Sequence, residues 1–461
     1  MSAAPENEND DREPEIGQSF GAELRRLRGE RGVSLTTLSR LVYYNKGYLS
    51  RVENGQRPAS VRLASRCDQA LAAAGALANL VPEQPARRRG WQRPAQLPST
   101  AVDFTGRRAP MTQLDVLCRA HSTVLIAGPP GVGKTALAVH WSHQAASRFP
   151  DGCLFANLRG YGPASAAAEP GEVLDRFLGA LGTPRGNIPR NPESAAALLR
   201  TYLHGRRMLI VLDNAASADQ VRPLLPGPGD CRVLVASRSR LSGLTARDGA
   251  RRLSLEPMPP GEAVALLGQI LGVQRVAAEP GAAARIARDC DYLPLALRIA
   301  ADRAQARPAL RLSALATQLA SDTDRLDLLG IVDDASAAVR TVFSWSYRAL
   351  SARPARMFRL LGLYRGQDIG IPAAAALAGT TPQEARQAVD ALTAVSLLEE
   401  CGPDRYRFHD LIRLYAAECA EVGETVADRA AAIRRLLTWY QHTADAADRA
   451  GTADASRDRR S

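Results

Sequence analysis

One short segment, GPPGVGKT at residues 128–135, constrains this chain more than any other feature. It has the spacing G-x-x-x-x-G-K-T, in which backbone N–H groups of a glycine-rich loop surround phosphate oxygens and the lysine reaches the outer phosphates. Only two of the 59 basic residues are lysines, Lys46 and Lys134, which suggests that lysine is kept where arginine serves less well. A compact ammonium suits a phosphate loop better than a planar guanidinium. The segment therefore predicts a site for nucleoside phosphates.

The flanking residues place this loop between a strand and a helix. Residues 122–127 (STVLIA) have the pattern of a short buried strand, and residues 135–147 that of a helix. A later apolar run, residues 208–212, ends in Asp213, whose carboxylate would hold a water on a Mg²⁺ ion bound by Thr135. We therefore expect ATP or ADP and Mg²⁺ as cofactors, with Lys134 and Asp213 in the catalytic roles. The expected loop contacts to the nucleotide are Gly128, Gly131, Val132, Gly133, Lys134, Thr135 and Ala136.

The overall composition limits the class of protein. With 461 residues, of which 46% are hydrophobic, two to four domains with packed cores are expected. The net charge of +11 favours an anionic partner. Seven scattered cysteines without C-x-x-C spacing argue against a cysteine zinc site and for a reducing compartment. The polar, acidic N-terminus is no signal peptide, and no apolar run is long enough to cross a membrane, so we expect a soluble cytoplasmic protein without a membrane partner.

Residues 17–81 are expected to form a compact all-helical domain. Apolar residues at helical spacing lie at 20–28 and at 35–41, Gly32 separates the two, and Ser34 caps the second helix. A third helix is predicted from Lys46 to Glu53 and a fourth over residues 58–71. Two short helices joined by a tight link, with a polar and basic second helix, are typical of a helix-turn-helix.

This domain is also a candidate DNA-binding surface. It holds ten basic and four acidic residues, a net charge of +6, which is more than half of the charge excess of the chain. Residues 44–55 (YNKGYLSRVENG) closely resemble the recognition helix of the phage-repressor-like (Xre-type) family. The resemblance implies double-stranded DNA as the partner; the alternative is a helical protein-docking module. The expected DNA contacts are Asn45, Lys46, Tyr48, Ser50, Arg51 and Arg57.

The rest of the chain divides by composition and pattern. Residues 1–16 are expected to be a disordered tail. Residues 82–104 are a Pro/Arg-rich linker, whose arginines either add non-specific DNA affinity or are simply solvated. Alternating strands and helices predict an α/β domain with a parallel sheet. The fold class is thus multidomain, with an all-α helix-turn-helix followed by an α/β NTPase domain and further helical domains. The expected later segments are the NTPase domain at 105–255, a helical lid domain at 256–325, a domain at 335–422, a helix at 426–450 and a tail at 451–461.

Four further motifs follow one another in a fixed order. They are FTGR at 104–107, SRSR at 237–240, LPLAL at 293–297 and FHDL at 408–411. Together with the phosphate loop they resemble the NB-ARC branch of the STAND signalling NTPases, over residues 104–422. With a helix-turn-helix in front, the chain is most similar to the AfsR-like regulators of actinobacterial secondary metabolism, without their C-terminal repeats. The resemblance implies that residues 335–422 form a winged helix that packs on the nucleotide.

The resemblance also implies roles for single residues. Gly106 and Arg107 would flank the adenine and ribose, and Arg238 would sense a γ-phosphate. Pro294 would pack on the adenine, and His409 would reach the β-phosphate of ADP and hold a closed state. Self-association would then follow ATP binding. Two positions depart from the family pattern: Asn214 stands where a second acid often follows Asp213, and Tyr292 stands where the lid motif usually has glycine.

These observations favour an ATP/ADP-switched transcriptional regulator, controlling a specialised-metabolism or stress gene cluster. Two other functions fit the same NTPase. One is an antiphage or stress-signalling scaffold, in which the helix-turn-helix serves autoregulation or protein docking. The other is a turnover ATPase or small-molecule kinase, which Asn214 and the lack of an acceptor-substrate motif argue against. At most a slow ATPase is expected.

Overall fold

The computed structural model describes residues 16–57, 59–81, 93–101, 103–162, 167–330 and 338–458, with only the backbone at 16–19, 61–62 and 447–458. These residues form two compact units, one within residues 1–91 and one within 92–461. The predicted tail at 1–16 and residues 82–92 of the predicted linker lie almost entirely outside the described residues. The later part of that linker instead joins the second unit, because the Cys153 N–H donates to the Pro94 carbonyl at 2.8 Å. The helix predicted to end at residue 450 continues to Asp458, so a tail beginning at 451 is wrong. No helix in the described ranges is long and apolar enough to span a membrane.

The first unit is all-helical, as predicted. Its core is made of apolar side chains from all four helices, among them Leu24, Leu38, Leu49 and Leu63. The third helix begins and ends at the predicted residues. The fourth begins at Val61 rather than at residue 58, because the Ser60 hydroxyl accepts a hydrogen bond from the Leu63 N–H and caps the helix there. The elements are α1 (Ile16–Glu30), α2 (Leu35–Val42), α3 (Lys46–Glu53), α4 (Val61–Leu71) and η1 (Ala78–Leu80).

Gly21 lets α1 and α3 approach closely. A Cβ atom at Gly21 would lie 2.6 Å from the Glu53 carbonyl oxygen and 2.7 Å from that of Val52, so Gly21→Ala must push the two helices apart. We expect the variant to lose about 1–3 kcal/mol of stability in this unit. Hydrogen exchange of the α1 and α3 amides in the full chain measures the loss. Gly29→Ala is the matched control in the same helix, where nothing lies within 4 Å. Equal exchange rates in the two variants would contradict the close packing.

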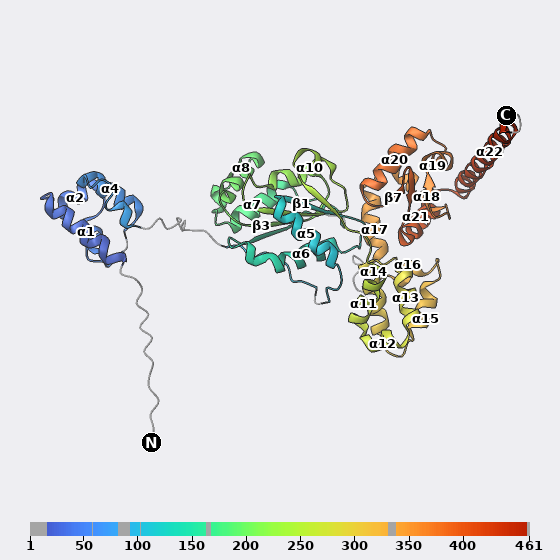
Figure 1. Cartoon of the computed structure of the whole chain (residues 1–461), viewed down its shortest axis with the longest axis horizontal. Coiled ribbons are helices and arrows are strands. Elements are labelled where there is room, and N and C mark those ends of the chain that lie inside the picture. The colour runs from blue at the N-terminus through green and yellow to red at the C-terminus, as the bar shows by residue number, and fades with distance from the viewer. Residues whose placement is uncertain are drawn as a thin grey trace, which may run out of the picture. The chain divides into compact units, whose positions relative to one another are not determined.

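The second unit begins with a five-stranded sheet in the order β2-β3-β4-β1-β5, and every pairing is parallel (Figure 1). This confirms the predicted α/β architecture. Helix α5 packs against β1 and β5, and α6 packs against β1, β3 and β4. The strands are β1 (Thr123–Ala127), β2 (Cys153–Asn157), β3 (Leu209–Ala215), β4 (Arg232–Ser237) and β5 (Arg251–Ser254). The helices are α5 (Arg108–Ala120), α6 (Lys134–Ala145), η2 (Ala146–Arg148), α7 (Pro170–Ala180), η3 (Arg185–Asn187), α8 (Pro192–Leu203), α9 (Ala218–Val221), η4 (Arg222–Leu224) and α10 (Ser242–Arg247).

Strand β3 differs from its prediction at its end. It runs through Asp213 to Ala215, and its register against β4 shifts between Leu212 and Ala215. Asn214, within this shift, has a left-handed backbone with φ 57°. The irregularity interrupts the pairing of β3 with β4 beside Asp213, whereas Asp213 remains paired with Asn157 of β2. It lies at the carboxyl edge, where ligands of parallel sheets bind.

The remaining elements form a helical domain and a C-terminal domain. The helical domain, the predicted lid, contains α11 (Pro260–Leu271), α12 (Val273–Ala278), α13 (Pro280–Asp289), α14 (Pro294–Gln305), α15 (Leu312–Leu319) and α16 (Arg325–Leu328). The C-terminal domain contains α17 (Val339–Arg348), α18 (Ala352–Gly362), β6 (Ile369–Gly370), α19 (Ile371–Ala378), α20 (Pro382–Ala394), β7 (Glu399–Gly402), β8 (Arg405–Arg407), α21 (Asp410–Gly423) and α22 (Val426–Asp458).

The C-terminal domain contains a small sheet and a well-capped helix. Strands β7 and β8 pair antiparallel as a hairpin, and β6 adds a third strand beside β8. Thr381 and Glu384 form a reciprocal capping box at the start of α20. The description of this domain as a winged helix stays a prediction.

Candidate nucleotide-binding site

The phosphate loop joins β1 to α6, and its glycines are required by geometry. Gly131 and Gly133 have φ of +80° and +93°, in the left-handed region that favours glycine. A Cβ atom at Gly128 would lie 2.3 Å from the Leu255 carbonyl oxygen. The lid docks directly on this loop, since the Leu295 N–H at the start of α14 donates to the Gly131 carbonyl at 3.2 Å. The loop is therefore a tight turn covered by the helical domain.

Lys134 folds back over this loop. Its Nζ donates to the carbonyl oxygens of Gly128 at 2.9 Å and Pro129 at 2.8 Å. Burial, and then the positive charge of Arg238, lower the pKa of Lys134 to about 7, against the opposing charge of Asp213. Neutral carbonyls do not balance the charge of a buried ammonium, whereas a phosphate would. The surroundings of Lys134 thus fit an anionic group in the loop.

Thr135 and Asp213 meet although 78 positions separate them, because the first turn of α6 faces the end of β3. The Thr135 hydroxyl donates to Asp213 Oδ1 at 2.8 Å. Burial raises the pKa of Asp213, although Thr135 and Lys134 act against this rise. A hydroxyl and a carboxylate at this spacing are hard oxygen donors of the kind that Mg²⁺ takes in phosphate sites. The pair fits the predicted magnesium position.

Two cavities border the phosphate loop. The smaller, about 60 Å³, is lined mainly by apolar groups, including Phe104, Met258 and Leu266, and Phe104 stacks on the His140 ring at 4.0 Å. The larger, about 370 Å³, holds Lys134, Thr135, Asp213 and Arg238. A planar base suits the first and a phosphate chain the second. The residues that line both cavities are Gly133, Ala136, Pro294 and Arg298.

Arg107 lines the smaller cavity, whereas Gly106 does not, and the Arg107 guanidinium is already bonded to the protein. Gly106 has φ +71°, and a Cβ atom there would lie 2.5 Å from the Glu262 carboxylate. The Arg107 N–H donates to that carboxylate at 2.8 Å. The Arg107 guanidinium donates to the carbonyl oxygens of Glu256 at 2.7 Å and Val132 at 2.9 Å. This arginine therefore ties the phosphate loop to the start of the helical domain.

Arg238 lines the larger cavity but reaches across to α17. Its guanidinium donates to the Val342 carbonyl at 2.5 Å and to the Ser346 hydroxyl at 3.1 Å. The guanidinium carbon lies 5.2 Å from the Tyr161 ring centre and 5.3 Å from that of Trp345. Burial lowers the pKa of Arg238 to about 10, which leaves it charged at neutral pH. An arginine of the larger cavity is thus held by the C-terminal domain.

His409 lies elsewhere, in a cavity of about 700 Å³ that meets the phosphate loop at Gly128 and Pro129. Its Nδ1 is 3.5 Å from Asp291 Oδ2, and its Nε2 is 3.8 Å from Glu399 Oε2. Burial lowers the pKa of His409. Burial, followed by the charges of Asp410 and Glu399, raises the pKa of Asp291 to about 8. The structure therefore brings Lys134, Thr135, Asp213, Arg238 and Pro294 together and leaves His409 among carboxyl groups.

The backbone at Tyr292 has a conformation that favours glycine. Tyr292 has φ 52° and Asp291 φ 53°, so two consecutive residues before α14 are left-handed. Glycine adopts this conformation without strain, and tyrosine does so at a cost. The turn is nevertheless anchored, because the Met258 N–H donates to the Tyr292 carbonyl at 3.0 Å. The departure in sequence thus leaves Pro294 at the cavity.

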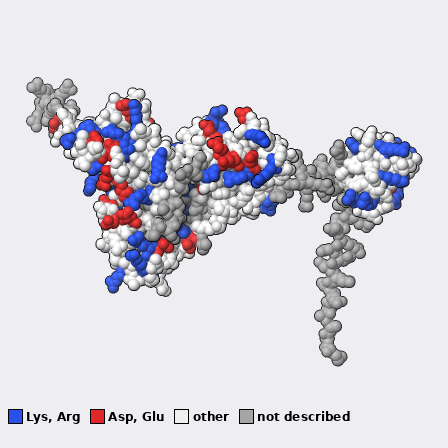
Figure 2. All heavy atoms as spheres, turned by 180° about the vertical axis from the view of Figure 1, so that it is seen from behind, with Lys and Arg blue, Asp and Glu red and all other residues white. Residues whose placement is uncertain are grey.

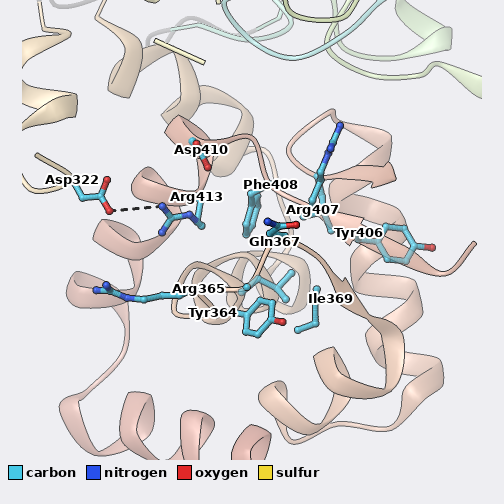
Figure 3. Close-up of a pocket in the computed structure, with 13 residues that line it drawn as sticks. Asp322, Tyr364, Arg365, Gln367, Ile369, Tyr406, Arg407, Phe408, Asp410 and Arg413 are labelled. Atoms are coloured by element: carbon cyan, nitrogen blue, oxygen red, sulfur yellow. Dashed lines mark ion pairs between the residues drawn. The ribbon is translucent and has the colours of Figure 1, made fainter. Parts of the chain in front are cut away.

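A further cavity of about 330 Å³ lies in the C-terminal domain (Figure 3). Its wall includes Phe408 and Gln367, and the ion pair of Asp322 with Arg413 at 3.8 Å closes one side. It adjoins the His409 cavity, because Gln367, Leu398, Arg407, Phe408 and Asp410 line both. The FHDL motif contributes Phe408 and Asp410 to its wall, although the family resemblance had assigned this motif only to the nucleotide site.

Sequence reasoning also missed three residues at the main site: Tyr161, Arg298 and Trp345. Arg298 could have been predicted from the sequence, because it follows Pro294 by four positions and so lies on the same face of the helix. Tyr161 and Trp345 had none, since a loop after β2 and a helix of the C-terminal domain meet there only through the tertiary fold.

The first unit presents most of the predicted DNA contacts at its surface. Lys46, Arg51 and Arg57 are exposed, and Figure 2 shows basic side chains spread over the visible face of this unit. The Asn45 side chain caps α3 by accepting from the Gly47 N–H at 2.8 Å, and Arg51 Nε donates to the Gly47 carbonyl at 3.2 Å. Tyr48 and Ser50 are partly buried, with Arg57 over the Tyr48 ring at 5.6 Å. The start of α3 is therefore rigid and basic.

Comparison with known proteins identifies the first unit and shows relatives of most of the chain. A family model described as a helix-turn-helix domain matches residues 19–81. The regulatory protein AfsR of Streptomyces coelicolor is 47% identical over 366 residues, covering 76% of this chain and 36% of the relative. AfsR of Streptomyces griseus is 46% identical over 368 residues, covering 78% and 37%. The chain thus spans a little over a third of the length of these relatives.

Solved structures give weaker similarities. A STAND protein with a tetratricopeptide-repeat sensor from Pyrococcus horikoshii is 18% identical with a TM-score of 0.34, covering 76% of this chain and 47% of that one. A Walker-type ATPase of Pyrococcus abyssi is 12% identical with a TM-score of 0.47, covering 70% and 98%.

Proposed function

We propose that this AfsR-like chain is a DNA-binding transcriptional regulator of the cytoplasm, switched by ATP and ADP. One observation carries the proposal: the arginine beside the phosphate loop, Arg238, is bonded to a helix of another domain. A site built only for turnover does not need such a bond. The helix-turn-helix matched at residues 19–81 supplies the DNA-binding part.

The nucleotide would lie along the two cavities, with its base against Phe104 and Pro294 and its phosphates at Lys134. Thr135 and Asp213 would hold Mg²⁺, the carboxylate through a water. The ion would neutralise phosphate charge during any hydrolysis. The ammonium of the half-buried Lys134 at the loop and the short Thr135–Asp213 distance support this assignment.

Slow hydrolysis is part of the proposal. Asn214 follows Asp213, where a second acid would be placed to orient water. Its side-chain amide donates to the Tyr161 carbonyl at 2.7 Å, so this group is engaged as a donor and cannot act as a base. A site that binds tightly and hydrolyses slowly suits a switch, and this observation disfavours the alternative of a turnover ATPase.

The coupling would run through the residues after β4. Besides the Arg238 contacts to α17, the Ser396 hydroxyl donates to the Arg238 carbonyl at 2.8 Å, and the Arg240 N–H donates to the Ala394 carbonyl at 2.8 Å. A γ-phosphate that attracts the Arg238 guanidinium would therefore compete with α17 for it. Loss of the α17 contacts would loosen the C-terminal domain, which would then be held at this point only through Ser396 and Ala394.

Self-association would carry the signal to DNA. Helix-turn-helix domains bind two half-sites as pairs, so joining two chains raises DNA affinity without a new contact. Moving an equilibrium from about 1:99 to 99:1 requires about 5.5 kcal/mol of differential binding. Exchange of Arg238 between α17 and the γ-phosphate, together with loss of the His409 contacts, would contribute to this difference.

Light scattering of the full chain tests the proposal. We expect a monomer with ADP and a larger species with a non-hydrolysable ATP analogue. We expect the larger species with His409→Ala even in ADP, because the imidazole would no longer pack between the turn before α14 and β7. His442→Ala, at an exposed position of α22, is the matched control and should stay monomeric in ADP. One mass under all conditions would refute switching by assembly.

A further inference from the structure

The two cavities beside the phosphate loop meet at four residues, and only one of these four is charged. Gly133, Ala136, Pro294 and Arg298 line both the apolar cavity and the cavity with Lys134. A nucleotide with its base in the first and its outer phosphates in the second must pass its ribose and first phosphate through this junction. Arg298 is therefore placed where the molecule first becomes anionic.

The other cations near the site are placed for different tasks. Arg107 lines only the apolar cavity, and its guanidinium is bonded to two backbone carbonyls. Lys134 and Arg238 line only the larger cavity. Lys134 is held at the loop, and Arg238 is held by α17 at the end of β4. None of these three lies at the junction.

Arg298 is also free to change partners. It stands on α14 one turn after Pro294, on the same helix face. Its guanidinium donates to the Asp103 carbonyl at 3.1 Å and lies 3.8 Å from the Asp103 carboxylate. Both side chains are more than a third exposed, at 38% and 37%, and ion pairs of this kind contribute little to stability. A phosphate oxygen, which gives a charge-assisted hydrogen bond, would compete well for the guanidinium.

We propose that Arg298 is a nucleotide-binding residue that recognises the phosphate attached to the ribose. This inference rests on the proposed nucleotide site. It means that the helical domain, through Arg298, binds the phosphate nearest the ribose. The loop lysine and Arg238 would then serve the outer phosphates. By this contact any adenine nucleotide with a 5′-phosphate holds α14 on the phosphate loop, whether or not a γ-phosphate is present.

The test is binding of adenosine, AMP and ADP to the full chain by calorimetry. Arg298→Gln should weaken AMP and ADP by about tenfold or more, the loss expected for one charge-assisted hydrogen bond, and leave adenosine unchanged. Arg298→Lys should recover part of the affinity as a point charge. Asp103→Asn, which removes the competing carboxylate, should keep or strengthen AMP binding. Arg285→Gln, an exposed arginine of the same domain, is the control.

The outcomes separate the inference from the function on which it rests. If the wild-type chain binds no ADP, the proposed nucleotide site fails. If the wild type binds ADP and Arg298→Gln binds AMP and ADP equally well, the assignment of Arg298 is wrong. An equal loss for adenosine would also overturn it, because the residue would then act on the base or on the fold of the lid.

Discussion

Lys134→Ala is expected to weaken ADP binding by about 100-fold or more. The ammonium is the buried cation of the phosphate loop, held by the Gly128 and Pro129 carbonyls. Without the ammonium, the outer phosphates of ADP would face these two carbonyl oxygens, and no positive charge of the loop would balance the phosphate charge. A charged hydrogen bond is worth about 1.5–3 kcal/mol, and the uncompensated charge adds to the loss. Calorimetry with ADP and Mg²⁺ measures the affinity.

Two variants sharpen this experiment. Lys134→Arg should also bind poorly, because the planar guanidinium does not fit between the loop carbonyls as a point charge does. Lys46→Ala removes the other lysine, which lies in the first unit, and should leave ADP affinity unchanged. The fold of the Lys134→Ala protein should survive, since a buried ammonium with a pKa near 7 contributes no stability of its own. Retained ADP affinity in Lys134→Ala would refute the phosphate assignment.

DNA affinity of the full chain is expected to fall about a thousandfold between 50 and 200 mM salt. Each phosphate neutralised adds about 0.9 to the log–log slope, and six contacts are enough for this effect. The net charge of +6 over residues 17–81 supplies the cations. The binding of a duplex at several salt concentrations gives the slope. Affinity that does not change with salt, or no retention of DNA at about 50 mM, would contradict a DNA-binding role.

Sequence preference should depend on α3 rather than on total charge. Arg51→Ala or Lys46→Ala should cost about 1–3 kcal/mol on a preferred site and much less on a random duplex, because we propose that these exposed side chains contact base edges. Arg40→Ala, an exposed arginine of α2, is the matched control and should weaken both duplexes alike. Equal losses on both duplexes for all three variants would place α3 on the DNA backbone instead.

Much of the fold follows from local chemistry that a sequence displays. Ser34 and Asn45 cap α2 and α3 with their own side chains, and Thr381 and Glu384 cap α20. Such capping signals lie within four residues of one another, so they can be recognised from the sequence alone. The phosphate loop is equally local. Asp213 was predictable because it ends an apolar strand, and the carboxyl ends of parallel strands, such as β1 and β3, lie at one edge of a sheet.

The remaining features depend on contacts between distant segments. Arg238 binds Val342 and Ser346, more than a hundred positions away, and no periodicity links them. The carboxyl groups around His409 come from the turn before α14 and from β7. The register shift at Asn214 arises from the pairing of β3 with β4, not from the residues alone. Pairings of this kind are set by the packing of domains, for which one sequence carries no direct signal.

The stacking of Arg238 against Trp345 makes the intrinsic fluorescence of this tryptophan sensitive to the position of the arginine. Indole emission responds to a cation at its face, and the guanidinium carbon lies 5.3 Å from the ring centre. Trp345 also lines the cavity that holds Lys134 and is partly buried, so it lies where two domains meet and where the proposed nucleotide would bind. Movement of Arg238 toward a γ-phosphate would change this fluorescence without any attached dye, and its time course would separate nucleotide arrival from the domain motion that follows.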